Sequence, residues 1–392
     1  MKNLFFEHIG SQPADLVLEI GRMWAKDPNP LKINLGIGIY LDEQGKCPVM
    51  DSVKLAEQKL LGIQQSKTYL PIEGDLQFIS ESKKLLFNDE SSFIVAMQSL
   101  GGTGALRILA DYLKIEMQKP IYVSDPTWPN HHGVFKAAGL DVRTYPYYDR
   151  NTHTPKKQEF IDFLDTLEKG SIVVLHGCCH NPTGVDLDPQ EWDLVLEKFQ
   201  KRGLFPFFDV AYLGLGEGLE KDRYAVESFY KAGLEMCVAL SFSKMMDLYN
   251  ERVGALMIVN HSHSIEAMQS TLKQIVRRNY SNPSAHGALV AGMIMKDHDL
   301  RSGWLKNLEH HRLRAKNMRH LLFDALKPWI QHKKEFLHGN GFFSYLGIPQ
   351  DLILKLRKES IYLLDDSRIN VLGVNHANIP ILKEVFERIG HG

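Results

Sequence analysis

Five consecutive apolar runs in the sequence end in unusual polar residues. Lys244 follows CVALSFS, and Asp209 follows LFPFF, with Tyr212 three residues later. A lysine beside anion-binding groups can lose its proton and act as a nucleophile. An acid that directly follows an apolar run is costly to bury unless a cation meets it. Lys244 and Asp209 are therefore the first candidates for chemistry.

Two further stretches offer groups that bind anions. Gly102 and Thr103 belong to GGTG, directly after FIVAMQSL and at the start of a helical pattern. Glycines allow backbone N–H groups to turn toward an anion, and a helix N-terminus favours negative charge. Taken alone, GGTG is also an ordinary loop-to-helix turn. A second set lies around the lysine: Ser241, Ser243 and Arg252.

The remaining strand ends carry an aromatic, an amide and a group of sulfur and imidazole side chains. Trp128 follows IYVSD and is placed to stack on a planar ligand, although a core tryptophan fits equally well. Asn181 lies in a turn that aims its amide into the same region. Thiolates and imidazoles are the ligands that zinc prefers, but adjacent cysteines without a second Cys/His pair are poorly arranged for a tetrahedral site. We therefore expect no metal at His176, Cys178, Cys179 and His180.

Together these groups predict one ligand, which needs a phosphate, a ring nitrogen that pairs with an acid, and an aldehyde that condenses with a lysine. Pyridoxal phosphate has all three. The motifs SFSKMMDLYNERVG, HGCCHNPTG, FFDVAY, SDPTWPNH, VRRNYSNPSAHGA and SRINVLG also resemble those of the fold type I aspartate and aromatic amino acid aminotransferases. The resemblance runs from residue 33 to residue 373, in compatible order and spacing.

The resemblance implies a role for each matching residue. Lys244 would form the Schiff base with pyridoxal phosphate and then move the proton. Asp209, with His131 behind it, would keep the ring nitrogen protonated, and Tyr212 would bond the ring's phenolic oxygen. The implied catalytic residues are Lys244, Asp209 and Tyr212; the others that bind the cofactor are Gly102, Thr103, Trp128, Asn181, Ser241, Ser243, Arg252 and Tyr69.

The resemblance also implies how substrate is held. Arg368 would grip the α-carboxylate, because a guanidinium offers two parallel donors. In the family, residues at the positions of Tyr69 and Arg277 reach into the neighbouring subunit's site, Tyr69 to the phosphate and Arg277 to a distal carboxylate. A homodimer with shared active sites is therefore expected. The implied substrate-binding residues are Gly38, Trp128, Asn181, Arg277 and Arg368.

The sequence departs from the family pattern directly after the lysine. Met245, Met246 and Asp247 stand where the family usually has an aromatic or aliphatic pair and a small residue. Asp247 places a negative charge near the expected phosphate site. We assume that its side chain points outward.

The elements that must position these residues alternate along the chain. Apolar runs at 91–100, 120–125, 171–179, 204–212, 236–243 and 254–260 have strand length, and their composition is typical of buried parallel strands. Helical patterns at 105–117 and 189–203 lie between them. The fold class is therefore α/β, with a mainly parallel doubly wound sheet in a large cofactor-binding domain and a smaller α+β domain built from both chain ends. We place the large domain at 45–300 and the small domain at 1–44 plus 301–392.

Composition excludes several classes of protein. The 392 residues, 44% hydrophobic and 24% charged, suit a globular chain of about two domains. A formal net charge of −1 gives no whole-protein field that would attract nucleic acid or an anionic membrane. No apolar run is long enough to span a bilayer, and four cysteines without a disulfide pattern fit a reduced compartment. We expect a cytoplasmic protein.

The resemblance implies an enzyme that transfers the amino group of an aromatic amino acid, aspartate or both to 2-oxoglutarate. Two alternatives stay open, an enzyme that prefers aspartate, or a decarboxylation or elimination on the same scaffold. A nucleotide-binding oxidoreductase is disfavoured because G-x-G-x-x-G is absent.

Overall fold

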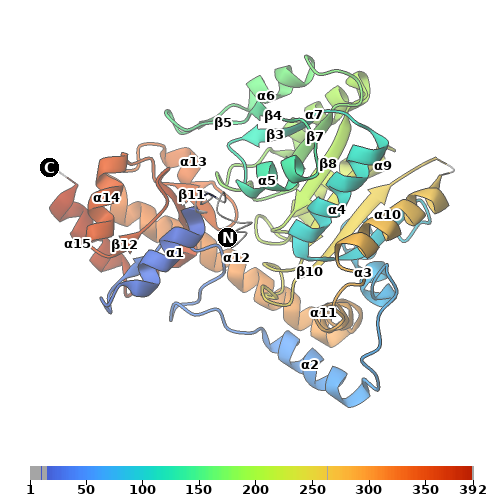
Figure 1. The fold of residues 1–392 in the computed structure, drawn as a ribbon. Coiled ribbons are helices and arrows are strands. Elements are labelled where there is room, and N and C mark those ends of the chain that lie inside the picture. The colour runs from blue at the N-terminus through green and yellow to red at the C-terminus, as the bar shows by residue number, and fades with distance from the viewer. Residues whose placement is uncertain (1–9, 11–15, 263, 391–392) are drawn as a thin grey trace, which may run out of the picture.

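A computed structural model describes residues 10, 16–262 and 264–390. Its centre is a seven-stranded sheet with the order β2-β10-β9-β8-β7-β3-β4 (Figure 1). The strands are β2 (Ile94–Leu100), β3 (Ile121–Asp125), β4 (Val142–Pro146), β7 (Ile172–His176), β8 (Phe205–Val210), β9 (Met236–Ser241) and β10 (Val253–Val259). Every residue of β9 and β10 is buried, as their apolar composition predicts.

The sheet is parallel except at β10, which pairs antiparallel with both β2 and β9. The expectation of a parallel strand at 254–260 is therefore wrong. The physical reason is the connection: about a dozen residues after β9 form a loop rather than a crossover helix, so the chain returns in the opposite direction. β4 was not expected, because its exposed residues interrupt the apolar pattern.

Helices cover both faces of the sheet, which confirms the doubly wound α/β class (Figure 1). One face carries α4 (Gly101–Glu116), α5 (Asn130–Ala137) and α10 (Ile265–Asn279). The other carries α3 (Leu76–Phe87), α6 (Lys157–Leu164), α7 (Pro189–Arg202), α9 (Tyr224–Lys231) and α11 (His286–Lys296), with the short α8 (Leu219–Asp222) beside α9. α2 (Asp51–Ile63) packs on α11, and a small hairpin joins β5 (Tyr148–Asp149) to β6 (Thr154–Pro155).

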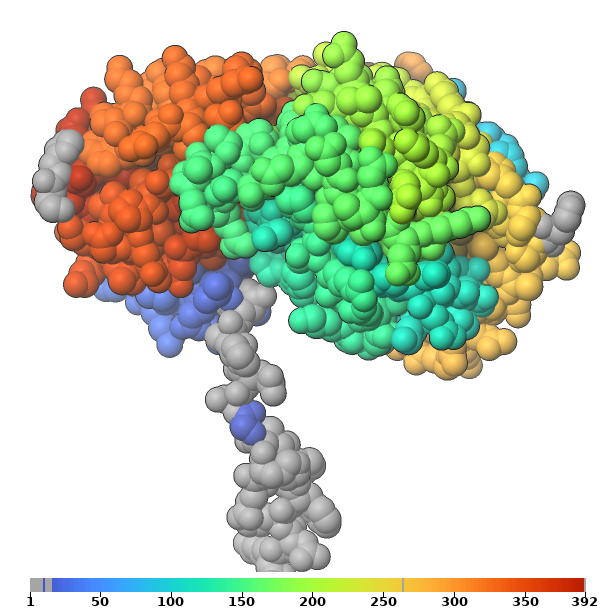
Figure 2. Space-filling model, turned by 90° about the horizontal axis from the view of Figure 1, so that it is seen from above, coloured from blue at the N-terminus to red at the C-terminus, as the bar shows by residue number. Residues whose placement is uncertain are grey.

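The two ends of the chain lie side by side. β1 (Ile33–Asn34) pairs in parallel with β12 (Ile361–Tyr362), and β11 (Phe343–Tyr345) pairs antiparallel with β13 (Arg368–Asn370). Figure 2 shows the blue N-terminal and red C-terminal segments together on one side and the green and yellow segments on the other. The helices here are α1 (Leu16–Lys26), α13 (Lys333–Leu337), α14 (Gln350–Lys358), α15 (Ile379–Ile389) and the 3-10 turn Val371–Gly373.

One long helix, α12 (His298–Leu326), connects the two groups of elements. It begins earlier than the charged pattern around LEHHRLRAKNMRHLL suggests, because Asp297 caps its first turn by accepting from the N–H groups of Asp299 and Leu300. The boundaries at residues 45 and 300 stay a prediction.

The carboxyl edge of the sheet gathers the polar strand ends. His176 ends β7, Asp209 is the next-to-last residue of β8 and Ser241 ends β9, while α4 begins directly after β2. In open α/β sheets, ligands bind outside this edge. The fold thus brings together residues that are far apart in the sequence.

Candidate active site

A cavity of about 160 Å³ lies at this edge of the sheet. Twelve of the fourteen site residues expected from the sequence line it, drawn from both groups of elements. They are Gly38, Gly102, Thr103, Trp128, Asn181, Asp209, Tyr212, Ser241, Ser243, Lys244, Arg252 and Arg368. Larger cavities occur elsewhere among the described residues, but none of these twelve residues lines them.

Asp209 is the buried acid of the cavity. Its side chain accepts a hydrogen bond from Nε2 of His131 at 3.0 Å, and the other nitrogen of that fully buried ring contacts Oγ1 of Thr127 at 2.7 Å. Burial acts to raise the pKa of Asp209. The His131 contact and the nearby Lys244 lower this pKa by a larger amount, so it lies below its usual value. Asp209 is therefore an anion at neutral pH, held in place to meet a cationic group in the cavity.

Lys244 lines the same cavity as Asp209. Its Nζ is 5.0 Å from the centre of the Tyr212 ring. Burial lowers the pKa of Lys244, and the Arg252 charge lowers it too, while Asp209 acts in the other direction. The Trp304 indole of α12 donates to the carbonyl oxygen of Met245 at 2.5 Å, which fixes the backbone directly after the lysine. Lys244 is thus a positioned amine that loses its proton more readily than a free lysine.

The start of α4 forms a cradle for an anion. The residue before this helix, Leu100, makes no side-chain cap, so the first N–H groups are left for another acceptor. Gly101 has φ +68°, and a Cβ there would lie 2.6 Å from Nη2 of Arg252. Nη1 of Arg252 donates to Oγ of Ser243 at 3.3 Å. Backbone donors, hydroxyls and a guanidinium therefore converge, as a phosphate dianion requires.

The polar side chains of Asn181 and Arg368 also line the cavity. Oδ1 of Asn181 is buried and has no hydrogen-bond partner in the described part of the chain. The buried Arg368 donates to the carbonyl oxygen of Gly36 at 3.3 Å, and its guanidinium carbon lies 4.3 Å from the centre of the Phe343 ring. An unpartnered carbonyl oxygen and a guanidinium are suited to a ligand that offers both a donor and an anion.

Six residues that line the cavity were not among those expected: Val17, Leu106, His176, Cys178, Ala211 and Phe343. The sequence suggests His176 only as a zinc ligand, although it lies at the end of an apolar run, as Asp209 does. Its ring is 5.3 Å from that of His131, and burial lowers its pKa to about 3, so it is neutral. No sequence signal pointed to Val17.

The structure does not bring Tyr69 and Arg277 into this cavity. Tyr69 is 90% exposed in the loop after α2, and Arg277 is exposed near the end of α10, where it donates to Oγ of Ser281. The two segments are adjacent, because Nδ2 of Asn282 donates to the carbonyl oxygen of Leu70 at 2.9 Å. Both side chains thus lie on the surface of a single subunit.

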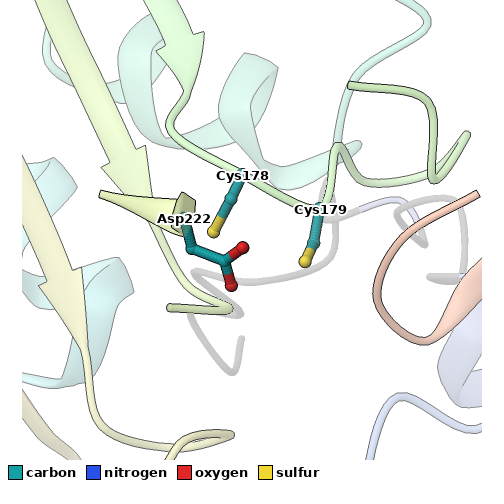
Figure 3. Close-up of side chains that lie close together, drawn as sticks. All are labelled: Cys178, Cys179 and Asp222. Carbon is teal, nitrogen blue, oxygen red and sulfur yellow. The ribbon is translucent and has the colours of Figure 1, made fainter. Parts of the chain in front are cut away.

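The adjacent cysteines lie beside the cavity together with an acid. The ligand atoms of Cys178, Cys179 and Asp222 all lie within 4.8 Å of one another (Figure 3). Asp222 already accepts from the N–H groups of Gly214, Gly216 and Glu217. Burial raises the pKa of the Cys179 thiol well above its usual range. Protonated thiols beside a carboxylate that is already bonded make a poor metal site.

The outward orientation assumed for Asp247 is wrong. Its side chain is 1% exposed and lies under α12. The reason is the tight turn after the lysine, where Asp247 has φ +53° and Met245 and Met246 are fully buried.

No helix in the described ranges is long and apolar enough to cross a membrane.

Comparison with known proteins finds relatives that are similar to this chain over nearly its whole length. The chain is 40% identical to the aspartate aminotransferase of Haemophilus influenzae, over 98% of this chain and 100% of that protein. It is 37% identical to the aromatic-amino-acid aminotransferase of Escherichia coli, over 98% of this chain and 100% of that protein.

Solved structures of two aminotransferases superpose closely on the structure of this chain. An aromatic-amino-acid aminotransferase from Burkholderia pseudomallei, covalently bound to pyridoxal phosphate, superposes with a TM-score of 0.93 at 38% identity, over 98% of this chain and 99% of that chain. An aromatic amino acid aminotransferase from Psychrobacter sp. B6, cocrystallised with aspartic acid, has a TM-score of 0.94 at 38% identity, over 99% of this chain and 100% of that chain. The family described as aminotransferase class I and II matches residues 30–386, and the chain belongs to it.

Proposed function

We propose that this protein is a pyridoxal-phosphate-dependent aminotransferase that transfers the amino group of aspartate or an aromatic amino acid to 2-oxoglutarate. The observation that carries the proposal is the convergence of Lys244, Asp209 and the cradle at the start of α4 on one cavity. Relatives that act on aspartate, on tyrosine and on aromatic amino acids are all 37–41% identical to this chain, which supports both substrate classes.

The residues of the cavity fit the cofactor. When bound, pyridoxal phosphate supplies an aldehyde that condenses with primary amines and a ring that withdraws electrons from the adjacent carbon. The uncapped N-terminus of α4, Ser241, Ser243 and Arg252 would hold its phosphate. Asp209 would hold a proton on the ring nitrogen, because its pKa is low and its charge is buried.

The other residues act on the substrate. Arg368 would bind the α-carboxylate, and Tyr212, with Asn181 beside it, would donate to the phenolic oxygen of the cofactor's ring. Lys244, whose pKa is lowered by burial, would take the proton from the substrate's α-carbon and return it to the carbon of the cofactor's aldehyde group.

We further propose a homodimer in which Tyr69 and Arg277 complete the partner subunit's site. Both are exposed on the surface of one subunit. Exposed apolar side chains precede and follow Tyr69 in the sequence, on α2 and at the start of α3, with Leu61 at 85%, Ile63 at 64% and Leu76 at 67% exposure. Large exposed apolar side chains in one segment support an interaction surface there. The cytoplasmic location and the lack of a nucleic-acid partner stay predictions of the sequence.

Replacing Lys244 with Ala should nearly abolish turnover. The variant keeps the phosphate cradle, so we expect it still to bind pyridoxal phosphate, measured by absorbance after desalting. Loss of the proton-transfer group should lower kcat by at least roughly 10²- to 10⁴-fold, assayed with aspartate and with tyrosine. Lys231→Ala, which changes an exposed lysine paired with Glu227, is the matched control and should keep full activity. Full activity of Lys244→Ala would overturn the assignment.

Arg277 and Arg368 should differ in which substrates they affect. A distal carboxylate gains a charge-assisted contact with Arg277 of about 1.5–3 kcal/mol, whereas an aromatic ring gains no ion pair. Arg277→Ala should therefore lower kcat/KM for aspartate by roughly 10- to 200-fold and have a clearly smaller effect for phenylalanine. Arg368→Ala should impair both substrates. The measurement is the half-reaction with each amino acid, and equal losses for Arg277→Ala would refute its role.

Mixed dimers test the shared site. Subunits with Lys244→Ala and subunits with Arg277→Asp are each defective. A hybrid dimer contains one doubly defective site and one intact site, because Lys244 and Arg277 of each site come from different subunits. Dicarboxylate activity should therefore rise when the two variants are unfolded and refolded together. Hybrids verified by mass spectrometry that gain no activity would contradict cross-subunit sites.

A further inference from the structure

Asp247 is a buried acid that the proposed reaction does not use. It is three residues after Lys244, and its side chain is 1% exposed. Neither of its carboxylate oxygens has a hydrogen-bond partner of good geometry within the described residues. An ionised carboxylate in such surroundings is strongly disfavoured. Burial accordingly raises the pKa of Asp247 to about 8, although the nearby Tyr249 phenol acts to lower it.

His311 of α12 faces this acid. Its Nδ1 lies 3.7 Å from Oδ2 of Asp247, its side chain is 5% exposed, and Nδ1 has no other hydrogen-bond partner among the described atoms. The two buried polar groups thus lie just beyond hydrogen-bond distance of each other, and the Tyr249 phenol is the other polar group beside Asp247. Burial lowers the pKa of His311 to about 3, and the charges of His310 and Arg314 act in the same direction. At neutral pH the pair therefore consists of a carboxylic acid and a neutral imidazole.

The pair lies between two segments of the active site. The Tyr40 ring stacks on His311, with ring centres 3.5 Å apart, and the N–H of Tyr40 donates to the Tyr249 hydroxyl at 2.9 Å. Tyr40 is two residues after Gly38, which lines the cavity, and Asp247 follows the lysine. The Asp247–His311 pair therefore joins the Lys244 loop, the Gly38 segment and α12.

The other titratable groups around the pair do not supply a neutralising charge next to Asp247. The N-terminal segment contributes Tyr40, Asp42 and Cys47, and burial raises the pKa of both Tyr40 and Cys47 to about 12. Arg314 of α12 is directed elsewhere, since it donates to the carbonyl oxygens of Leu41 and Asp42 and pairs with Glu43. The remaining neighbours are Tyr249 and the exposed His310.

We propose that Asp247 and His311 are positioning residues that hold the Lys244 loop against α12, and that they do so while the Asp247 carboxyl keeps its proton. Ionisation leaves a buried negative charge without a cation and separates the loop from the helix. The inference rests on the proposed aminotransferase activity only for its kinetic measurement.

The pKa shifts of Asp247 and His311 determine the direction in which stability changes with pH. The pKa of Asp247 is raised from 3.8 to about 8, so its contribution to stability is complete below about 3.8 and is lost as pH rises through about 8. The pKa of His311 is lowered from 6.5 to about 3, so its contribution is present above 6.5 and is lost as pH falls through about 3. Activity that depends on the neutral pair should fall on the alkaline side.

The test compares the holoenzyme with the Asp247→Asn variant, which keeps the shape of the side chain and cannot ionise. Between pH 7 and pH 9, the wild-type kcat/KM should fall by up to about tenfold through this pair. Asp247→Asn should retain at least about threefold more of its pH 7 activity at pH 9 than the wild type does. His310→Gln, the matched control on the exposed side of α12, should follow the wild-type profile. An Asp247→Asn profile that matches the wild type would overturn the proposal.

A second variant and an infrared measurement test the proposal even if Asp247→Asn does not fold. In His311→Gln, an amide N–H can donate to the carboxylate, so the midpoint of the alkaline loss should move to lower pH by at least about half a unit. Infrared spectra of wild-type holoenzyme should contain a protonated carboxylic acid band that disappears near pH 8 and is absent from Asp247→Asn. If the pH midpoint in His311→Gln is unchanged, or if the wild-type spectrum lacks this carboxylic acid band, the proposed role of Asp247 and His311 is wrong. An inactive wild type would instead refute the proposed function, because the infrared band does not depend on turnover.

Discussion

The carboxylate of Asp209 is buried at the carboxyl edge of the sheet, where an unpaired charge would be unstable, and the site is arranged around it. His131 donates to it from α5 and is itself held by Thr127. Lys244 approaches from the loop after β9, and its charge lowers the pKa of Asp209. The remaining space beside the carboxylate is suited to a protonated ring nitrogen. Stability of the empty protein and affinity for the cofactor thus depend on the same buried charge.

The two groups of elements contribute different parts of the site. The sheet and α4 provide the acid, the lysine and the anion cradle, all from the strand ends between β2 and β10. The paired chain ends provide Gly38, Phe343 and Arg368, which line the same cavity. α12 runs from one group to the other and contacts the backbone after Lys244 through Trp304, so it connects the paired chain ends to the lysine loop. Asp247 and His311 add a second connection at the same place.

Apolar runs and the polar residues that follow them are local features, and they predicted most of the sheet and ten of the cavity's residues. Gly38 and Arg368 were expected only from the resemblance to the family. It did not predict that β10 is antiparallel, since direction depends on how the chain returns after β9. The burial of Asp247 was also missed, because its partner His311 is far away in the sequence and the pair is recognisable only when α12 packs over the loop. Tyr69 and Arg277 do not line the cavity of the single subunit, and their contribution to a partner subunit's site stays a prediction.

The central claim is that Lys244, among all the lysines of the chain, reacts with pyridoxal phosphate. Borohydride treatment of the loaded protein converts the bond between the cofactor's aldehyde carbon and a lysine nitrogen into a stable secondary amine. Proteolysis and mass spectrometry then identify the modified residue. We predict a single pyridoxyl group on the peptide that contains Lys244, and none after prior replacement of Lys244 by Ala. Modification of another lysine in the wild-type protein, with Lys244 unmodified, would contradict the account.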